Sequence, residues 1–83
     1  KTQGNWPYVW LNRLEWVKPL RADPLDSLTV SYQRSFLKGI AYFFIAPSYS
    51  SRQELNQRIQ ILEKVVDNWK KSLEALKQLK TID

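Results

Sequence analysis

A heptad rhythm of apolar residues runs through the last third of the chain. Large apolar side chains recur there at alternating spacings of four and three residues: Leu55, Ile59, Leu62, Val66, Trp69, Leu73 and Leu76. These spacings are typical of positions a and d on a helix that packs lengthwise against other helices. Residues 51–80 contain neither Pro nor Gly, and Ser51 with Glu54 fits a capping box at their start. The pattern therefore predicts a long helix over residues 51–80.

A second helix is predicted over residues 24–46. Asp23 can cap its start, and Pro24 suits its first turn, where a missing N–H costs little. Apolar and small residues then recur at spacings of three and four: Leu25, Leu28, Tyr32, Phe36, Gly39, Phe43 and Ala46. Further apolar residues in the later half occupy a second face, which predicts that this half is buried nearly all round. Residues 39–46 alone would also fit a buried strand, but the upstream periodicity favours a helix, in which Gly39 would admit another helix or a bulky Trp.

The shortest predicted helix covers residues 6–18. Asn5 is a good N-cap, and Pro19 disfavours helical geometry at the residue before it. A strand over residues 8–11 would fit the aromatic and β-branched side chains there, yet no second alternating run exists to pair with it. The N-terminal aromatic residues are expected in the core, and the alternative is a stacking platform for bases or sugars. These residues are Trp6, Tyr8 and Trp10.

Together the three segments predict an all-α fold. It is a small antiparallel three-helix arrangement dominated by a long helical hairpin of the second and third helices. Residues 1–83 are enough for one domain. Because the sequence begins at Lys1 and contains no Met, we expect a processed product or a segment of a longer protein. The longest apolar run, residues 39–46, is far shorter than the roughly 20 residues of a membrane-crossing helix, so no transmembrane segment is predicted.

The composition offers little for catalysis. The chain has no His and no Cys, which removes the commonest general base, nucleophile and transition-metal ligands. Its two glycines are too far apart for a phosphate-binding loop. The eight carboxylates show no convergent spacing and fit helix caps or solvated helix faces. We therefore expect no enzyme activity, no cofactor and no metal site.

A net charge of +5 permits an anionic partner without requiring one. Four lysines of the third predicted helix occupy two adjacent heptad positions beside the apolar residues: Lys64, Lys70, Lys71 and Lys77. Such a Lys stripe would suit weak binding to nucleic acid or to an anionic membrane surface, helped by the N-terminal aromatics. Acidic residues interrupt it, so a solubilising flank is the favoured interpretation.

Helix lengths indicate where a partner protein would bind. At 1.5 Å per residue the third helix would be about 43 Å long, the second about 34 Å and the first about 18 Å. The second helix would then cover the third only as far as about Ser72, with the first helix alongside the same portion. The residues left without cover would form a seam with another protein or a second copy: Leu73, Leu76 and Leu79, flanked by Lys70 and Lys77.

Two alternatives would leave no such seam. Leu20 and Leu25 would fold over the uncovered leucines, or the last turns of the helix would fray. The function that the sequence favours is a non-enzymatic interaction or assembly module, which binds another protein or itself.

Overall fold

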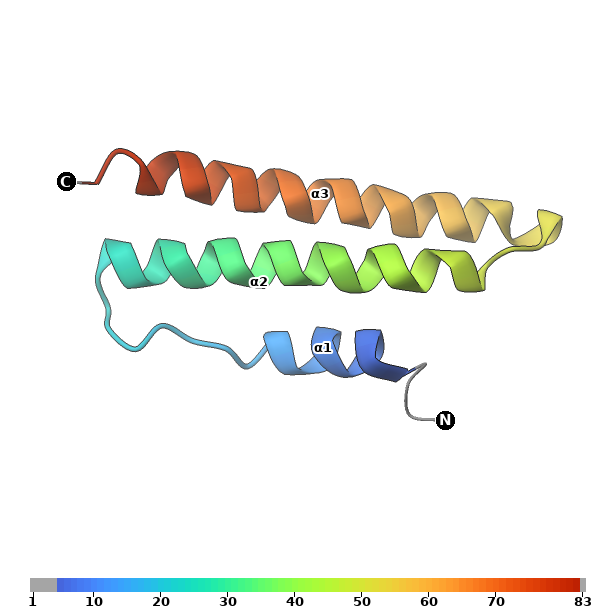
Figure 1. Ribbon diagram of the computed structural model, residues 1–83, viewed down its shortest axis with the longest axis horizontal. Helices are drawn as coiled ribbons and strands as arrows, with labels where there is room; N and C mark the ends of the chain where they lie inside the picture. The colour runs from blue at the N-terminus through green and yellow to red at the C-terminus, as the bar shows by residue number, and fades with distance from the viewer. Residues whose placement is uncertain (1–4, 83) are drawn as a thin grey trace.

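The computed structural model describes residues 5–82. Its elements, in chain order, are α1 (Trp6–Leu14), α2 (Pro24–Ile45), the short 3₁₀ turns η2 (Ala46–Ser48) and η3 (Arg52–Glu54), and α3 (Leu55–Leu79). α2 and α3 run antiparallel as a long hairpin, and α1 lies beside α2 (Figure 1). The predicted all-α fold with a dominant helical hairpin is confirmed.

Local capping chemistry sets the starts of the two hairpin helices. The Asp23 carboxylate accepts a hydrogen bond from the Asp26 backbone N–H at 2.8 Å, and Pro24 occupies the first turn of α2. After the turn, the Glu54 carboxylate accepts from the backbone N–H and the hydroxyl of Ser51, at 3.3 and 2.9 Å. α2 therefore begins at the predicted residue, whereas a 3₁₀ turn precedes the α-helical part of the third segment.

α1 ends at Leu14, so the prediction of a helix reaching residue 18 is wrong. Beyond this end, the Arg34 guanidinium of α2 donates hydrogen bonds to the carbonyl of Leu14, at 3.1 Å, and to that of Val17. The Leu14 carbonyl also accepts from the Val17 backbone N–H, so this side chain ties the end of α1 and the segment after it to α2. Asn5 lies at the N-cap position, as predicted, but its side chain makes no capping hydrogen bond.

An ion pair fastens the same end of α1 to α2. Lys38 of α2 pairs with Glu15, the residue that follows α1. A hydrogen bond and electrostatic attraction from the Lys38 ammonium hold the pKa of the Glu15 carboxyl below its ordinary value of 4.5. With Arg34, this pair places two cations at the C-terminus of α1, where the helix dipole favours positive charge.

In the view down the shortest axis, α2 lies between α1 and α3 (Figure 1), and the small extent along that axis makes the arrangement a layer. Within residues 5–82, α1 packs on α2 and makes no close backbone contact with α3, although Tyr8 and Leu11 of α1 line one depression with Ile61 and Lys64 of α3. The layer measures 49 × 25 × 14 Å, and its radius of gyration is 14.8 Å. A compact domain of this length would have a radius of gyration of about 12 Å. The chain therefore presents two broad faces to its surroundings.

Small residues line the contact between α2 and α3. On α3 the buried side chains are Val65, Ser72 and Ala75, each at most 4% exposed. On α2 the buried Ser35 and Gly39 lie against α3. Short side chains let two helix backbones approach closely, and the missing side chain of Gly39 makes room in this contact for one large residue, Trp69.

Most of the strongest apolar pattern of the chain lies outside this contact, with Trp69 as the exception. We define the heptad stripe as six large apolar residues of α3 that are between 38% and 52% exposed: Leu55, Ile59, Leu62, Val66, Trp69 and Leu73. The prediction that this stripe packs within the domain holds for Trp69, which lies against Gly39 of α2, and is wrong for the stripe as a whole, because α3 turns Val65, Ser72 and Ala75 toward α2. The later half of α2 is not buried all round either, since Phe36, Phe43 and Phe44 are at least 40% exposed.

Candidate protein-binding face

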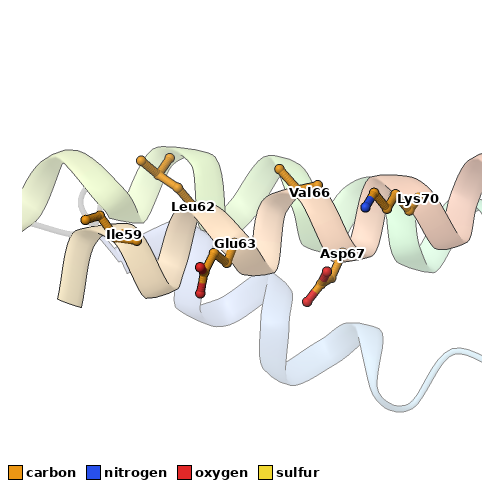
Figure 2. A pocket seen from close by; sticks show the side chains of 6 residues that line it. All are labelled: Ile59, Leu62, Glu63, Val66, Asp67 and Lys70. Atoms are coloured by element: carbon orange, nitrogen blue, oxygen red, sulfur yellow. The ribbon is translucent and has the colours of Figure 1, made fainter. Parts of the chain in front are cut away.

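A shallow depression runs along the exposed side of α3 (Figure 2). Its lining residues all belong to α3: Ile59, Leu62, Glu63, Val66, Asp67 and Lys70. In Figure 2, Leu62 and Val66 project to one side of the helix, and Glu63 and Asp67 project to the other. An apolar row of the heptad stripe thus runs beside a charged edge, an arrangement typical of a helix that binds another helix.

Trp69 joins the heptad stripe to α2. Its indole ring lies between Phe36 and Phe43, with ring centroids 6.5 and 6.3 Å away and an interplanar angle of 29° to each. The indole N–H donates a hydrogen bond to the Phe36 carbonyl at 3.2 Å. A Cβ built on Gly39 would overlap the indole, so the missing side chain of this residue makes room for the ring. The prediction that Gly39 admits a bulky Trp is confirmed.

The aromatic contacts continue across all three helices. We define the aromatic row as the connected rings of Tyr32, Phe36, Trp69, Phe43, Phe44, Trp6 and Trp10. Phe44 lies 5.2 Å from Trp6, and Trp6 lies 4.7 Å from Trp10, between ring centroids. Tyr8 is 51% exposed and takes no part in the row, so the core interpretation is wrong for this residue. The row carries the apolar surface of α3 over α2 to α1.

The leucines of the predicted C-terminal seam differ in exposure. Leu73 is 50% exposed, whereas Leu76 and Leu79 are half-buried. α2 reaches beyond Ser72, because Ala75 is buried and lines a depression together with residues from the start of α2. The expectation that α2 stops at Ser72 is therefore wrong, and Leu73 is exposed because it belongs to the heptad stripe.

Exposure also tests whether Leu20 and Leu25 cover the leucines at the C-terminal end of α3. Leu20 is 97% exposed and Leu25 is 54% exposed, so these residues do not cover the leucines of α3. α3 is helical to Leu79. Among the flanking lysines, Lys77 lies 4.0 Å from Glu74, and Lys70 lines the depression of Figure 2.

The four lysines of the predicted Lys stripe lie in two separate rows. The Lys64 ammonium lies over the ring of Tyr42, 5.4 Å from its centroid. Lys71, two helical turns later, occupies the same row as Lys64, and Lys70 and Lys77 lie about 100° further around the helix. By the same helical geometry the acidic residues Asp67 and Glu74 lie between the two rows. The positive charges are thus interrupted and do not form one continuous surface.

The exposed face could be found only in part from the sequence. The heptad periodicity marks the α3 side, but it gives no sign that Phe43 and Phe44 are exposed. A usable signal is the spacing of Phe36, Gly39 and Phe43, which places a gap between two rings on one side of α2. Such a gap accepts a large ring from a neighbouring helix, as Trp69 shows.

The fold and this face define the class of the protein: an all-α helical layer with an apolar, aromatic-rich surface. Across residues 5–82, no three residues among His, Cys, Asp and Glu gather as metal ligands. No helix in the described part of the chain is long and apolar enough to cross a membrane. Comparisons with protein-family models, with curated proteins and with solved structures found no match to this chain.

Proposed function

We propose that this chain is a non-enzymatic assembly module that binds another protein, or a second copy of itself, through the heptad stripe of α3. The observation that carries the proposal is the exposure of six large apolar side chains, each between 38% and 52%, at coiled-coil spacing. Single exposed apolar residues are common on monomers, whereas a contiguous apolar surface is typical of an interaction site.

The total exposed area supports the same proposal. The chain exposes 6533 Å². A compact monomer of its mass would expose about 5200 Å². The excess of about 1300 Å² is larger than the ~800 Å² that each partner buries in a typical protein complex. A helix layer with an apolar face gains stability when a second layer covers it.

Adjacent positions on α3 offer a matched test. Val66→Ser changes the exposed heptad stripe, and Val65→Ser makes the same change in a side chain that is 3% exposed and faces α2. We expect Val66→Ser to abolish the association measured by sedimentation velocity or by stoichiometric co-purification with an untagged partner. Its melting temperature should stay close to that of the parent, whereas Val65→Ser should lower the melting temperature.

The opposite pattern would contradict the proposal. If Val66→Ser lowers the melting temperature as much as Val65→Ser and leaves association unchanged, the heptad stripe belongs to the core of the domain. Sedimentation and co-purification both need the folded state, so far-ultraviolet circular dichroism of each variant serves as the control.

A further inference from the structure

We infer that the occupant of the heptad stripe is α3 of a second copy, lying antiparallel about a two-fold axis between Val66 and Asp67. The inference rests on the proposed function and adds the identity of the partner, its orientation and its register. It starts from the charged edge of the depression in Figure 2, where Glu63 and Lys70 lie beside the apolar row.

Glu63 and Lys70 occupy the same heptad position, one repeat apart, so both lie on one edge of the stripe. A two-fold axis halfway between them places Glu63 of one copy beside Lys70 of the second copy, and the reverse. A parallel, in-register pair would turn the two copies of this edge to opposite sides of the interface, where Glu63 and Lys70 could not pair with each other. Opposite charges at flanking positions select the orientation of paired helices, so the edge favours the antiparallel arrangement.

The apolar residues extend to both sides of this axis. Ile59 and Leu62 lie on one side, and Trp69 and Leu73 lie on the other. An antiparallel pairing about the axis brings Leu62 of one copy within two residues, about 3 Å along the helix, of the level of Leu73 of the second, which continues the apolar contact over the length of the stripe. A contact of this kind is self-complementary, as a two-fold interface requires.

The shape of the layer fits the same partner. The layer is 14 Å thick along its shortest axis. The aromatic row extends the apolar face from α3 across α2 to α1. A second copy brings an equally broad face, so two layers stacked face to face cover both stripes and both rows at once.

Charge exchange at the edge tests the orientation and register. Glu63→Lys and Lys70→Glu each create two repulsive contacts in the antiparallel dimer, and each should raise the dissociation constant about tenfold. The double variant Glu63→Lys, Lys70→Glu restores both pairs and should return within about threefold of the parent. An equimolar mixture of the two single variants should form a heterodimer. The edge of one chain then carries two positive charges, and the edge of the other carries two negative charges.

Lys71→Glu is the matched control for Lys70→Glu. It makes the same charge change at the next residue, which lies in the row of Lys64 and away from the charged edge. Sedimentation equilibrium should show little change in its dissociation constant. A Lys71→Glu variant that weakens association as much as Lys70→Glu would overturn the proposed register.

Spin labels report the orientation independently. A nitroxide on Asn56→Cys should lie about 30 Å from its copy along an antiparallel helix pair, on a rise of 1.5 Å per residue from the axis. Labels on Asp67→Cys should lie much closer to each other. Equal label separations at the two positions would indicate a parallel pair and overturn the inference.

The parent chain separates this inference from the function on which it rests. A parent that stays monomeric to about 1 mM in sedimentation equilibrium overturns the second copy as the occupant. If Val66→Ser then still abolishes binding of a different protein, the proposed function stands. If Val66→Ser abolishes neither self-association nor binding of a different protein, the inference and the proposed function both fail.

Discussion

Gly39→Ala probes the packing that shapes the exposed face. A Cβ on this residue would overlap the indole of Trp69, so the ring has to move away from α2. That movement breaks the hydrogen bond from the indole N–H to the Phe36 carbonyl. It also separates the indole from the rings of Phe36 and Phe43.

The contributions to the free energy of unfolding have opposite signs. The hydrogen bond is worth about 1 kcal/mol, and the two aromatic contacts about 0.5–1.5 kcal/mol each. Replacing Gly by Ala inside a helix returns about 1 kcal/mol. Trp69 is 38% exposed, so its ring can swing into solvent, which limits the overpacking strain. We therefore expect Gly39→Ala to lower the free energy of unfolding by about 1–3 kcal/mol.

Urea unfolding followed by far-ultraviolet circular dichroism measures this change. The matched control is the same substitution in a Trp69→Leu background, where no indole has to move. There Gly39→Ala should raise the free energy of unfolding by up to about 1 kcal/mol, the helix-propensity gain alone. An equal increase in both backgrounds would refute the packing of Trp69 on Gly39.

Three further changes probe the α1 contact and the lysines. Arg34→Ala should lower the free energy of unfolding by about 1.5–3 kcal/mol in urea, because the carbonyls at the end of α1 lose a charged donor; exposed Arg13→Ala should change it little. The free energy of unfolding measured in urea should fall as the pH drops below 4.5. The lowered pKa of Glu15 means that its pair with Lys38 stabilises the fold only while the carboxyl is ionised. Glu15→Gln should reduce this pH dependence, and an unchanged profile would contradict it. A fluorescent oligonucleotide should bind weakly or not at all at physiological salt, and any binding should fall with salt at a log–log slope of roughly −3. Replacing the four lysines by Gln should then remove most of it, and tight sequence-dependent binding would contradict this expectation; these lysines are Lys64, Lys70, Lys71 and Lys77.

Short-range signals predicted the helices well. The start of α2 follows from Asp23 and Pro24, whose capping chemistry needs only neighbouring residues. The contact that ties the end of α1 to α2 could not be predicted in this way, because the Leu14 carbonyl is bound by Arg34, twenty positions along the chain. A contact between distant residues leaves no local mark in the sequence.

The sequence also did not predict which face of α3 packs on α2. Periodicity ranks Val66 and Leu73 above Ser72 and Ala75, because large apolar side chains lose more contact with water on burial. The structure buries Ser72 and Ala75 instead, and Ala75 lines one depression with Ser35 of α2, where small residues allow the helices to approach closely. The heptad pattern thus indicates a packing surface without indicating whether the same chain or another one covers it.

Thiol labelling at positions 65 and 66 tests most directly whether the heptad stripe is an open surface that binds a second copy. The chain contains no Cys, so Val65→Cys and Val66→Cys each introduce a single thiol. In dilute protein we expect maleimide to react much faster at position 66, because Val66 is 49% exposed and Val65 only 3%. Raising the protein concentration should slow the reaction at position 66 as second copies cover it. Equal rates at the two positions, or a rate at position 66 that stays constant up to about 1 mM protein, would contradict an open and self-binding stripe.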